Sequence, residues 1–484
     1  MLRSIDHRSQ EHSTVAAFSQ DGMKSSSMDL RNKRVTVVGL ARTGMASVRF
    51  LLTQGAQVAA TDLKTERELI EQAAMLKPLG VDLDLGGHSS NRLLASDLIL
   101  LSPGVPLSLE PLQEALAKGI PVISEVELAF QFLRGRIVGI TGSNGKTTVT
   151  TLIHELLVGA GLFSQVGGNI GTPLIALLDS SRENGFTVTE LSSFQLEATQ
   201  RFRAHIAVVT NISPDHLDRH GTMEAYLRAK ERIFRNQTAE DWAILNADDP
   251  IVSAMPGRTA ARVLYFSRRQ QPTEGVFVRG SRIVCRIDGA EQELLGVSEI
   301  PLRGGHNVEN VLASLGAGLA AGAEPELMTE AVRNFRGVEH RLEWVAEING
   351  VDYFNDSKAT NVDSTMKALE AFPSNILLIA GGKDKDTDYT PLRPLVERRV
   401  KRLILIGAAA DKIYRALAGS APDVRAKTMA EAVRFAYEAA EPGDVVLLAP
   451  ACASFDMFEN FEHRGRIFKV EVRALAEAHV REKS

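Results

Sequence analysis

The sequence is short of several features, and each shortage narrows the class of protein. Only two cysteines, Cys285 and Cys452, occur among 484 residues. This excludes a disulfide framework and is typical of a reducing compartment. No run of about 18 apolar residues is present, so we predict no membrane span. The formal net charge of −5 gives no reason to expect a nucleic-acid partner.

The N-terminal segment lacks the apolar core of a signal peptide, because residues 1–27 are polar and Ser-rich. We therefore expect a cytoplasmic protein in which residues 1–27 form a disordered extension, with Met28 as an alternative start. We further expect a monomer.

The length and the order of apolar runs indicate the domain organisation. A chain of 484 residues is expected to form about three domains. From Lys33 onward, β-rich runs alternate with helix-like segments, which is typical of α/β proteins with parallel sheets. We predict a Rossmann-like first domain (28–133), a central P-loop domain with a parallel sheet (134–336) and a Rossmann-like C-terminal domain (337–484).

A glycine-rich turn lies between a predicted strand at 136–140 and a predicted helix at 149–158. This order is typical of a nucleoside triphosphate site, because N–H groups at a helix N-terminus face the phosphates. We expect Lys146 at the β/γ oxygens and Thr147 at Mg²⁺. The spacing departs from the common P-loop pattern, whose first glycine falls here on Ile140. The predicted phosphate-binding residues are Gly142, Ser143, Asn144, Gly145, Lys146, Thr147 and Thr148.

A second glycine turn, Gly39–Gly44, follows the first predicted strand. It resembles a dinucleotide-binding turn, but Ala41 replaces the glycine that lets a backbone approach a pyrophosphate. Ala41 therefore argues against NAD, and the turn is compatible with another pyrophosphate, such as that of a nucleotide sugar. Asp62, at the end of the next strand, is placed to meet a ribose hydroxyl. A simple packing turn is the alternative.

Polar groups also follow strands beside the P-loop. Glu190 and His216 are predicted at neighbouring strand ends, where ligands of α/β proteins bind. A carboxylate and an imidazole at that edge suit Mg²⁺ and phosphate oxygens. The alternative is that both are solvated loop residues.

Lys230 lies on the apolar face of a predicted helix over 226–234, with Tyr226 and Phe234 at helical spacing. The pattern alone favours a lysine whose ammonium reaches solvent. The alternative is a buried lysine, whose low pKa would make the neutral amine available.

Two further groups of polar residues are notable. Asn307 and Asn310 lie one turn apart on a predicted helix, where amides suit an adenine edge; N-capping is the alternative for Asn307. In the third domain, polar groups follow several strands and indicate a second ligand site. They lie at 356–361, at Lys383 and Lys385, and at 451–461.

Together these segments resemble the Mur ligases, the ATP-dependent amide-forming enzymes of peptidoglycan precursor synthesis. The resemblance runs from about Arg31 to the C-terminus. The motifs occur in the family's order: Thr141–Thr147, Gly167–Gly171, Glu190–Glu197, Asp215–Asp218, Tyr226–Lys230, Gly305–Asn307 and His340–Arg341. The blocks Asn355–Asn361 and Ala451–Ser454 are similar to the members that add D-glutamate.

The resemblance implies a ligase that adds D-glutamate to UDP-N-acetylmuramoyl-L-alanine through an acyl phosphate, using ATP and two Mg²⁺ ions. It implies Lys146, Glu190, His216 and Lys230 as catalytic residues. It also implies metal ligation by Thr147, Glu190, His216 and Lys230, with Lys230 carrying a CO₂-derived carbamate. ATP is expected to contact the P-loop together with Asn307, Asn310, Arg341 and Asp356.

The resemblance also implies two substrate sites. For the UDP-substrate, the implied residues are Leu40, Arg42, Thr43, Gly44, Asp62, Lys64, Ser102, Pro103, Gly104 and Asn169. For D-glutamate, they are Lys358, Thr360, Lys385, Ser454 and Phe461. The alternatives are a folylpolyglutamate synthase-like ligase, a catalytically silent nucleotide-binding protein of the same fold, and an NAD oxidoreductase.

Overall fold

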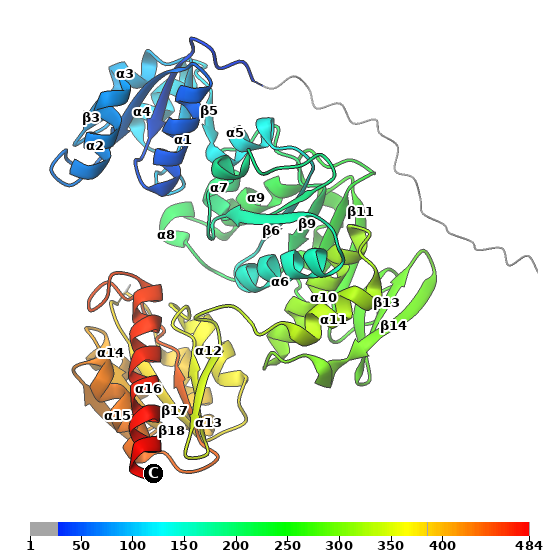
Figure 1. The fold of residues 1–484 in the computed structure, drawn as a ribbon, viewed down its shortest axis with the longest axis vertical. Helices are drawn as coiled ribbons and strands as arrows, with labels where there is room; N and C mark the ends of the chain where they lie inside the picture. Colours follow the sequence, from blue (N-terminus) through cyan, green and yellow to red (C-terminus); the bar gives the residue numbers. More distant parts are fainter. Residues whose placement is uncertain (1–27, 385, 484) are drawn as a thin grey trace, which may run out of the picture.

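The computed structural model describes residues 28–384 and 386–483. The predicted extension at 1–27 and the predicted ligand residue Lys385 lie outside the described residues. Three α/β bodies follow one another along the chain (Figure 1), each built on one sheet of five, nine or six strands. The predicted fold class is therefore confirmed. The boundaries at 133/134 and 336/337 stay a prediction.

The first sheet has the strand order β3-β2-β1-β4-β5, and all its pairs are parallel. Its inner strands are largely buried because helices cover both faces of such a sheet. The strands are β1 (Arg34–Val38), β2 (Gln57–Asp62), β3 (Asp82–Leu85), β4 (Leu98–Leu101) and β5 (Val122–Ser124). The helices are α1 (Arg42–Thr53), α2 (Ile70–Leu76), α3 (Ser90–Leu94), α4 (Glu110–Ala117) and α5 (Glu125–Phe132).

The central sheet has the order β14-β13-β12-β11-β10-β9-β6-β8-β7 and is parallel from β7 to β12. Its strands are β6 (Arg136–Thr141), β7 (Ser164–Gly168), β8 (Phe186–Glu190), β9 (Ile206–Val209), β10 (Trp242–Asn246), β11 (Arg262–Ser267), β12 (Gly275–Arg279), β13 (Arg282–Ile287) and β14 (Ala290–Gly296). Its helices are α6 (Lys146–Gly159), α7 (Ser193–Glu197), α8 (Leu217–His220), α9 (Met223–Glu231), α10 (Gly305–Ala320) and α11 (Pro325–Asn334).

The position of β6 in this sheet determines what surrounds the P-loop. β6 pairs with β8 on one side and with β9 on the other. Because carboxyl ends of parallel strands meet at one edge, the ends of β8 and β9 flank the turn between β6 and α6. The helix predicted over 226–234 begins and ends three residues earlier: α9 runs from Met223 to Glu231, and a 3₁₀ turn covers Arg232–Phe234.

The third sheet has the order β15-β16-β20-β17-β18-β19, with only β15 antiparallel to its neighbour. Its strands are β15 (Glu343–Ile348), β16 (Val351–Asn355), β17 (Ile376–Gly381), β18 (Val400–Ile406), β19 (Asp423–Ala426) and β20 (Val445–Leu448). Its helices are α12 (Val362–Glu370), α13 (Arg393–Arg399), α14 (Ala410–Leu417), α15 (Met429–Ala439) and α16 (Phe461–Lys483). None of the described helices is long and apolar enough to cross a membrane.

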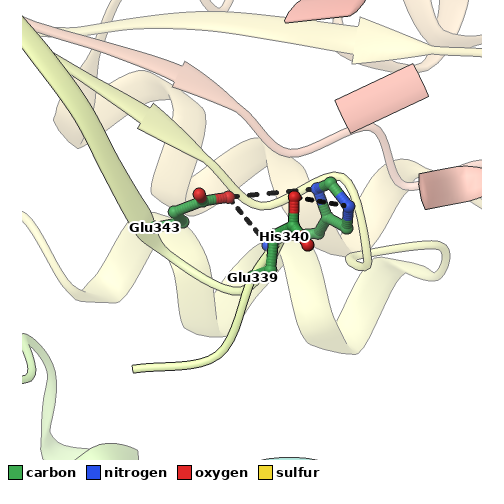
Figure 2. Close-up of side chains that lie close together, drawn as sticks. All are labelled: Glu339, His340 and Glu343. Carbon is green, nitrogen blue, oxygen red and sulfur yellow. Dashed lines mark hydrogen bonds and ion pairs between the residues drawn. The ribbon is translucent and has the colours of Figure 1, made fainter. Parts of the chain in front are cut away.

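The connection into the third domain carries a charged cluster, Glu339, His340 and Glu343 (Figure 2). One ligand-type atom from each lies within 4.8 Å of the others, close enough to hold a metal ion. However, Lys469 of α16 pairs with both carboxylates, at 2.5 Å from Glu339 and 2.8 Å from Glu343. The ammonium group of Lys469 already neutralises the two carboxylates. This cluster is therefore a set of ion pairs that holds residues 339–343 against α16.

Candidate functional site

The P-loop adopts a conformation that only glycine tolerates at two positions. Gly142 and Gly145 have φ of +138° and +84°. A Cβ atom on Gly142 would lie 2.0 Å from Thr210 Oγ1, and one on Gly145 would lie 2.4 Å from Asn310 Oδ1. The turn is therefore fitted between the end of β9 and the start of α10. The first N–H groups of α6 have no intrahelical acceptor, which makes this helix N-terminus suited to phosphate.

Five polar side chains converge at the end of β8. Glu190 is buried and accepts hydrogen bonds from Thr147 Oγ1 at 2.8 Å and Asn169 Nδ2 at 2.7 Å. Lys358, from the third domain, donates to Thr147 Oγ1 at 2.7 Å. Lys146 donates to the carbonyl groups of the loop that precedes it. Of the predicted residues, the structure thus brings Lys146, Thr147, Asn169, Glu190 and Lys358 together.

The electrostatics of this cluster hold Glu190 as an anion. Burial alone would raise the pKa of Glu190, but the charges of Lys146 and Lys358 and two hydrogen bonds bring that pKa below its usual value. Burial lowers the pKa of Lys146. Burial and the charge of Arg341 lower the pKa of Lys358 to about 8. Glu190 is therefore no solvated loop residue, and that alternative is wrong.

Lys230 is buried, with 3% of its surface exposed. Its Nζ donates to the Gly142 carbonyl at 2.7 Å and lies 4.7 Å from the centre of the Tyr226 ring. The solvent-reaching lysine that the helix pattern favours is therefore wrong, because the helix face packs against the P-loop rather than at the domain surface. Burial, and next the like charge of Lys146, lower the pKa of Lys230 well below its ordinary value.

His216 lies at the start of α8 in a left-handed conformation, with φ of +53°. Half of its side-chain surface is exposed, and its Nε2 is 3.6 Å from Asp215 Oδ2. Its ring packs edge-on against Phe194 of α7, with ring centres 4.9 Å apart. The role of His216 as a metal ligand stays a prediction.

A cavity of about 300 Å³ lies between the P-loop and the third domain. Burial raises the pKa of Asp356 in its wall to about 6 and lowers that of His306 to about 4. The predicted ATP residues that line it are Asn144, Gly145, Asn310, Arg341 and Asp356. The lining also includes His306 of the Gly305–Asn307 motif, and residues that the sequence did not indicate: Thr210, Asn211, Phe266, Arg268 and Lys367.

Asn307 is outside that lining. Its side-chain amide donates to the Arg303 carbonyl at 2.8 Å, and its Oδ1 accepts from Asn310 at 2.9 Å. Gly304, and not Asn307, is the N-cap of α10, so the N-capping alternative is wrong. Asn307 instead orients Asn310, whose side chain touches the P-loop.

A second cavity, of about 560 Å³, lies between the first domain and the central domain. The predicted residues that line it are Arg42, Thr43, Asp62, Lys64, Ser102, Pro103, Gly104 and Asn169. His88 and Gln195 also line this cavity, although neither is a predicted ligand residue. The glycine pair before His88 is a sequence signal for a turn at a strand end, but not for a ligand residue. Leu40 is fully buried, and its N–H donates to Asp62 at 2.7 Å.

Gly44 holds α1 against β1 rather than lining this cavity. A Cβ atom on Gly44 would lie 1.9 Å from the Gly39 carbonyl oxygen, whereas one on Gly104 meets no atom within 4 Å. We expect Gly44→Ala to lower the free energy of unfolding by about 2–4 kcal/mol through overpacking. Gly104→Ala is the matched control, expected to unfold at the wild-type urea concentration. Equal stability of the two variants would contradict this assignment.

The third domain contributes a further set of contacts. Lys358 Nζ lies 5.5 Å from the centre of the Phe461 ring. Ser454 is buried beyond the end of β20. Asn144 of the P-loop donates to Asp363 and accepts from Ser364 at 3.1 Å, both in the first turn of α12. The third domain thus contacts the P-loop through α12 and Lys358. The predicted residue Thr360 lies two positions after Lys358 in the sequence.

Three α/β domains, with a P-loop in the central one and a cavity at each junction between domains, are typical of a multidomain nucleotide-dependent protein. Models of known families match in the same order. The MurD-like N-terminal domain of Mur ligases matches residues 33–124, the Mur ligase middle domain 140–318, and the Mur ligase glutamate ligase domain 340–452. The chain belongs to the Mur ligase family, as its motifs predict.

Individual proteins of this family are also similar to the chain. The UDP-N-acetylmuramoylalanine–D-glutamate ligase of Acidobacterium capsulatum is 52% identical, over 91% of this chain and 96% of its own length. The ligase of the same name from Koribacter versatilis is 50% identical, over 93% of this chain and 99% of its own length. A pseudomurein peptide ligase type C from Methanothermus fervidus is 21% identical, with a TM-score of 0.55 over 86% of this chain and 96% of that one. The last similarity concerns the fold alone.

Proposed function

We propose that this protein is an ATP-dependent ligase that joins D-glutamate to UDP-N-acetylmuramoyl-L-alanine. The observation that carries the proposal is the similarity to two D-glutamate ligases at 50% identity or more over at least 91% of the chain. The geometry supports it, because one cavity reaches the cluster around Glu190 and the other reaches the P-loop. Asn169 lines one cavity and hydrogen-bonds Glu190, and Asn144 lines the other within the P-loop.

The chemistry requires activation of a carboxylate, whose hydroxide is a poor leaving group. An oxygen of the alanyl carboxylate attacks the γ-phosphorus of ATP, and ADP leaves with the electron pair of the broken P–O bond. The amine of D-glutamate then attacks the resulting acyl phosphate, loses a proton and expels inorganic phosphate as the amide forms. Two anions must meet in the first step, so the ammonium group of Lys146 lowers the electrostatic barrier.

The residues at the end of β8 fit a divalent cation. Thr147 Oγ1 and the ionised Glu190 are oxygen ligands of the kind that Mg²⁺ prefers, and they lie 2.8 Å apart. In the proposal, Thr147, Glu190, His216 and a modified Lys230 hold two Mg²⁺ ions. When bound, Mg²⁺ neutralises phosphate oxygens and polarises the phosphorus.

The surroundings of Lys230 also fit a carbamate. Burial lowers the pKa of this amine, which increases the fraction of the neutral form whose lone pair reacts with CO₂. The product, R–NH–COO⁻, forms with loss of one proton. It would replace the repulsion between Lys230 and Lys146 with attraction.

The remaining residues have binding roles in the proposal. The P-loop with Asn310, Arg341 and Asp356 binds ATP, and Asn307 acts through Asn310. The second cavity, from Arg42 to Asn169, binds the UDP-substrate, with Leu40 and Gly44 shaping its turn. Lys358, Thr360, Ser454 and Phe461 bind D-glutamate together with Lys385, which lies outside the described residues.

One assay tests the proposed function. We expect phosphate release by the full chain only when ATP, Mg²⁺, UDP-N-acetylmuramoyl-L-alanine and D-glutamate are all present, with the amide product detected by mass. L-Glutamate is the stereochemical control. Release with a folate and L-glutamate instead would favour the folylpolyglutamate synthase alternative. No release with either pair would favour a silent nucleotide-binding protein.

A further inference from the structure

The buried guanidinium of Arg464, in the first turns of α16, is the feature from which we infer a new role. Only 1% of Arg464 is exposed. Its Nε donates to Ser357 Oγ at 2.9 Å and its Nη2 to the Ser357 carbonyl at 2.7 Å. Its Nη1 donates to the carbonyl groups of Cys452 at 3.1 Å and Ala453 at 3.3 Å. Arg464 therefore ties the segment after β16 to the segment after β20.

All acceptors of this guanidinium are neutral. Within residues 28–384 and 386–483, it forms no ion pair with a carboxylate, and the charge of Asp456 acts on it from a greater distance. Burial lowers the pKa of Arg464 to about 10, so the group remains protonated at neutral pH. A buried cation that is solvated only by carbonyl and hydroxyl groups is costly. Its positive potential, which the negative charge of Asp456 partly offsets, favours a nearby anion.

Each segment that Arg464 holds is followed by a residue of the proposed D-glutamate site. Ser357 precedes Lys358, and Ala453 precedes Ser454. Ser357 Oγ also donates to the carbonyl group of Phe461 at 2.8 Å. The three proposed ligand residues are thus anchored through one side chain and its hydroxyl partner.

The backbone geometry adds a second reason. In a trans peptide, the C=O and N–H groups point in opposite directions. Drawing the carbonyl groups of Cys452 and Ala453 toward Arg464 turns the following two N–H groups to the other side of the segment. Ala451, just before, has φ of +58°. A left-handed residue next to a right-handed one turns successive N–H groups to one side, in the concave arrangement that accepts anions.

We propose that Arg464 is a positioning residue for D-glutamate: it fixes the segments around Ser357 and Ala453 and adds a buried positive charge that favours the carboxylates of this substrate. This inference rests on the proposed function and extends it to a residue that does not itself contact the substrate. In the proposed function, ATP and the UDP-substrate bind mainly outside these segments, so we expect Arg464 to affect their binding less.

The test compares Arg464→Lys with Ser357→Ala, using Arg473→Met on an exposed site of the same helix as the control. We expect Arg464→Lys to raise the KM for D-glutamate about tenfold, as for loss of charge-assisted hydrogen bonds. The KM for ATP should change less than about twofold. ADP formed in a single turnover without D-glutamate should stay at the wild-type level. Ser357→Ala should raise the same KM by a smaller factor.

The outcomes separate the two proposals. Failure of the wild-type protein to join D-glutamate would overturn the proposed function. If the wild-type protein is active and both variants keep its KM for D-glutamate, the role of Arg464 is overturned and the proposed function stands. An equal rise in the KM for ATP would also overturn that role, since it would indicate a general structural defect. If Arg464→Lys does not fold, as judged by thermal unfolding, Ser357→Ala decides the question.

Discussion

Replacing Lys230 with alanine is expected to lower the turnover of the full reaction roughly 1000-fold or more. The variant loses the amine that would become a carbamate, and with it an anionic ligand beside the P-loop. The substitution also empties a position that contacts the Gly142 carbonyl. Turnover should be measured as phosphate release at saturating substrates.

Rescue separates the carbamate role from a packing role. Short-chain carboxylates such as formate or acetate should restore part of the lost turnover in Lys230→Ala and have no such effect on the wild type. Arg228→Ala, an exposed position of the same helix, should keep wild-type turnover. A Lys230→Ala variant with more than about a tenth of wild-type turnover would be incompatible with the proposed role.

Glu190→Gln is expected to have the second largest effect, a fall in turnover of roughly 100- to 1000-fold. The substitution preserves size and can still accept a hydrogen bond from Thr147, but it removes the negative charge that Lys146 and Lys358 surround. The Mg²⁺ concentration for half-maximal turnover should rise at the same time. A magnesium titration of phosphate release measures both quantities.

The control for this variant is Glu155→Gln, at an exposed position of α6. It removes the same charge from the same domain and should leave the magnesium dependence unchanged. If Glu190→Gln keeps wild-type turnover and magnesium dependence, Glu190 is not a ligand of the metal.

The order of strands and helices could be predicted because it depends on local patterns. The P-loop, for example, required only a strand, a glycine turn and Lys146-Thr147 in sequence. The ends of β8 and β9 could likewise be placed beside it, since parallel strands bring their carboxyl ends to one edge.

The contacts of individual side chains could not be predicted in the same way. The burial of Lys230 depends on what packs against its helix, and that partner is the P-loop, almost ninety residues away. The hydrogen bond from Lys358 to Thr147 joins residues 211 positions apart. The contacts of Arg464 could not be predicted either, although the residue follows a predicted ligand segment, because its acceptors are mostly backbone carbonyls, which every sequence possesses.

Asn169 belongs to two sites at once. It lines the cavity of the first domain, and it donates to Glu190 through both its side chain, at 2.7 Å, and its backbone N–H, at 2.9 Å. On the proposed assignment, any displacement of Asn169 by the sugar nucleotide is therefore transmitted to the metal and ATP. Thermodynamic linkage makes such a coupling reciprocal: the factor by which one ligand changes the affinity for the other is the same in both directions.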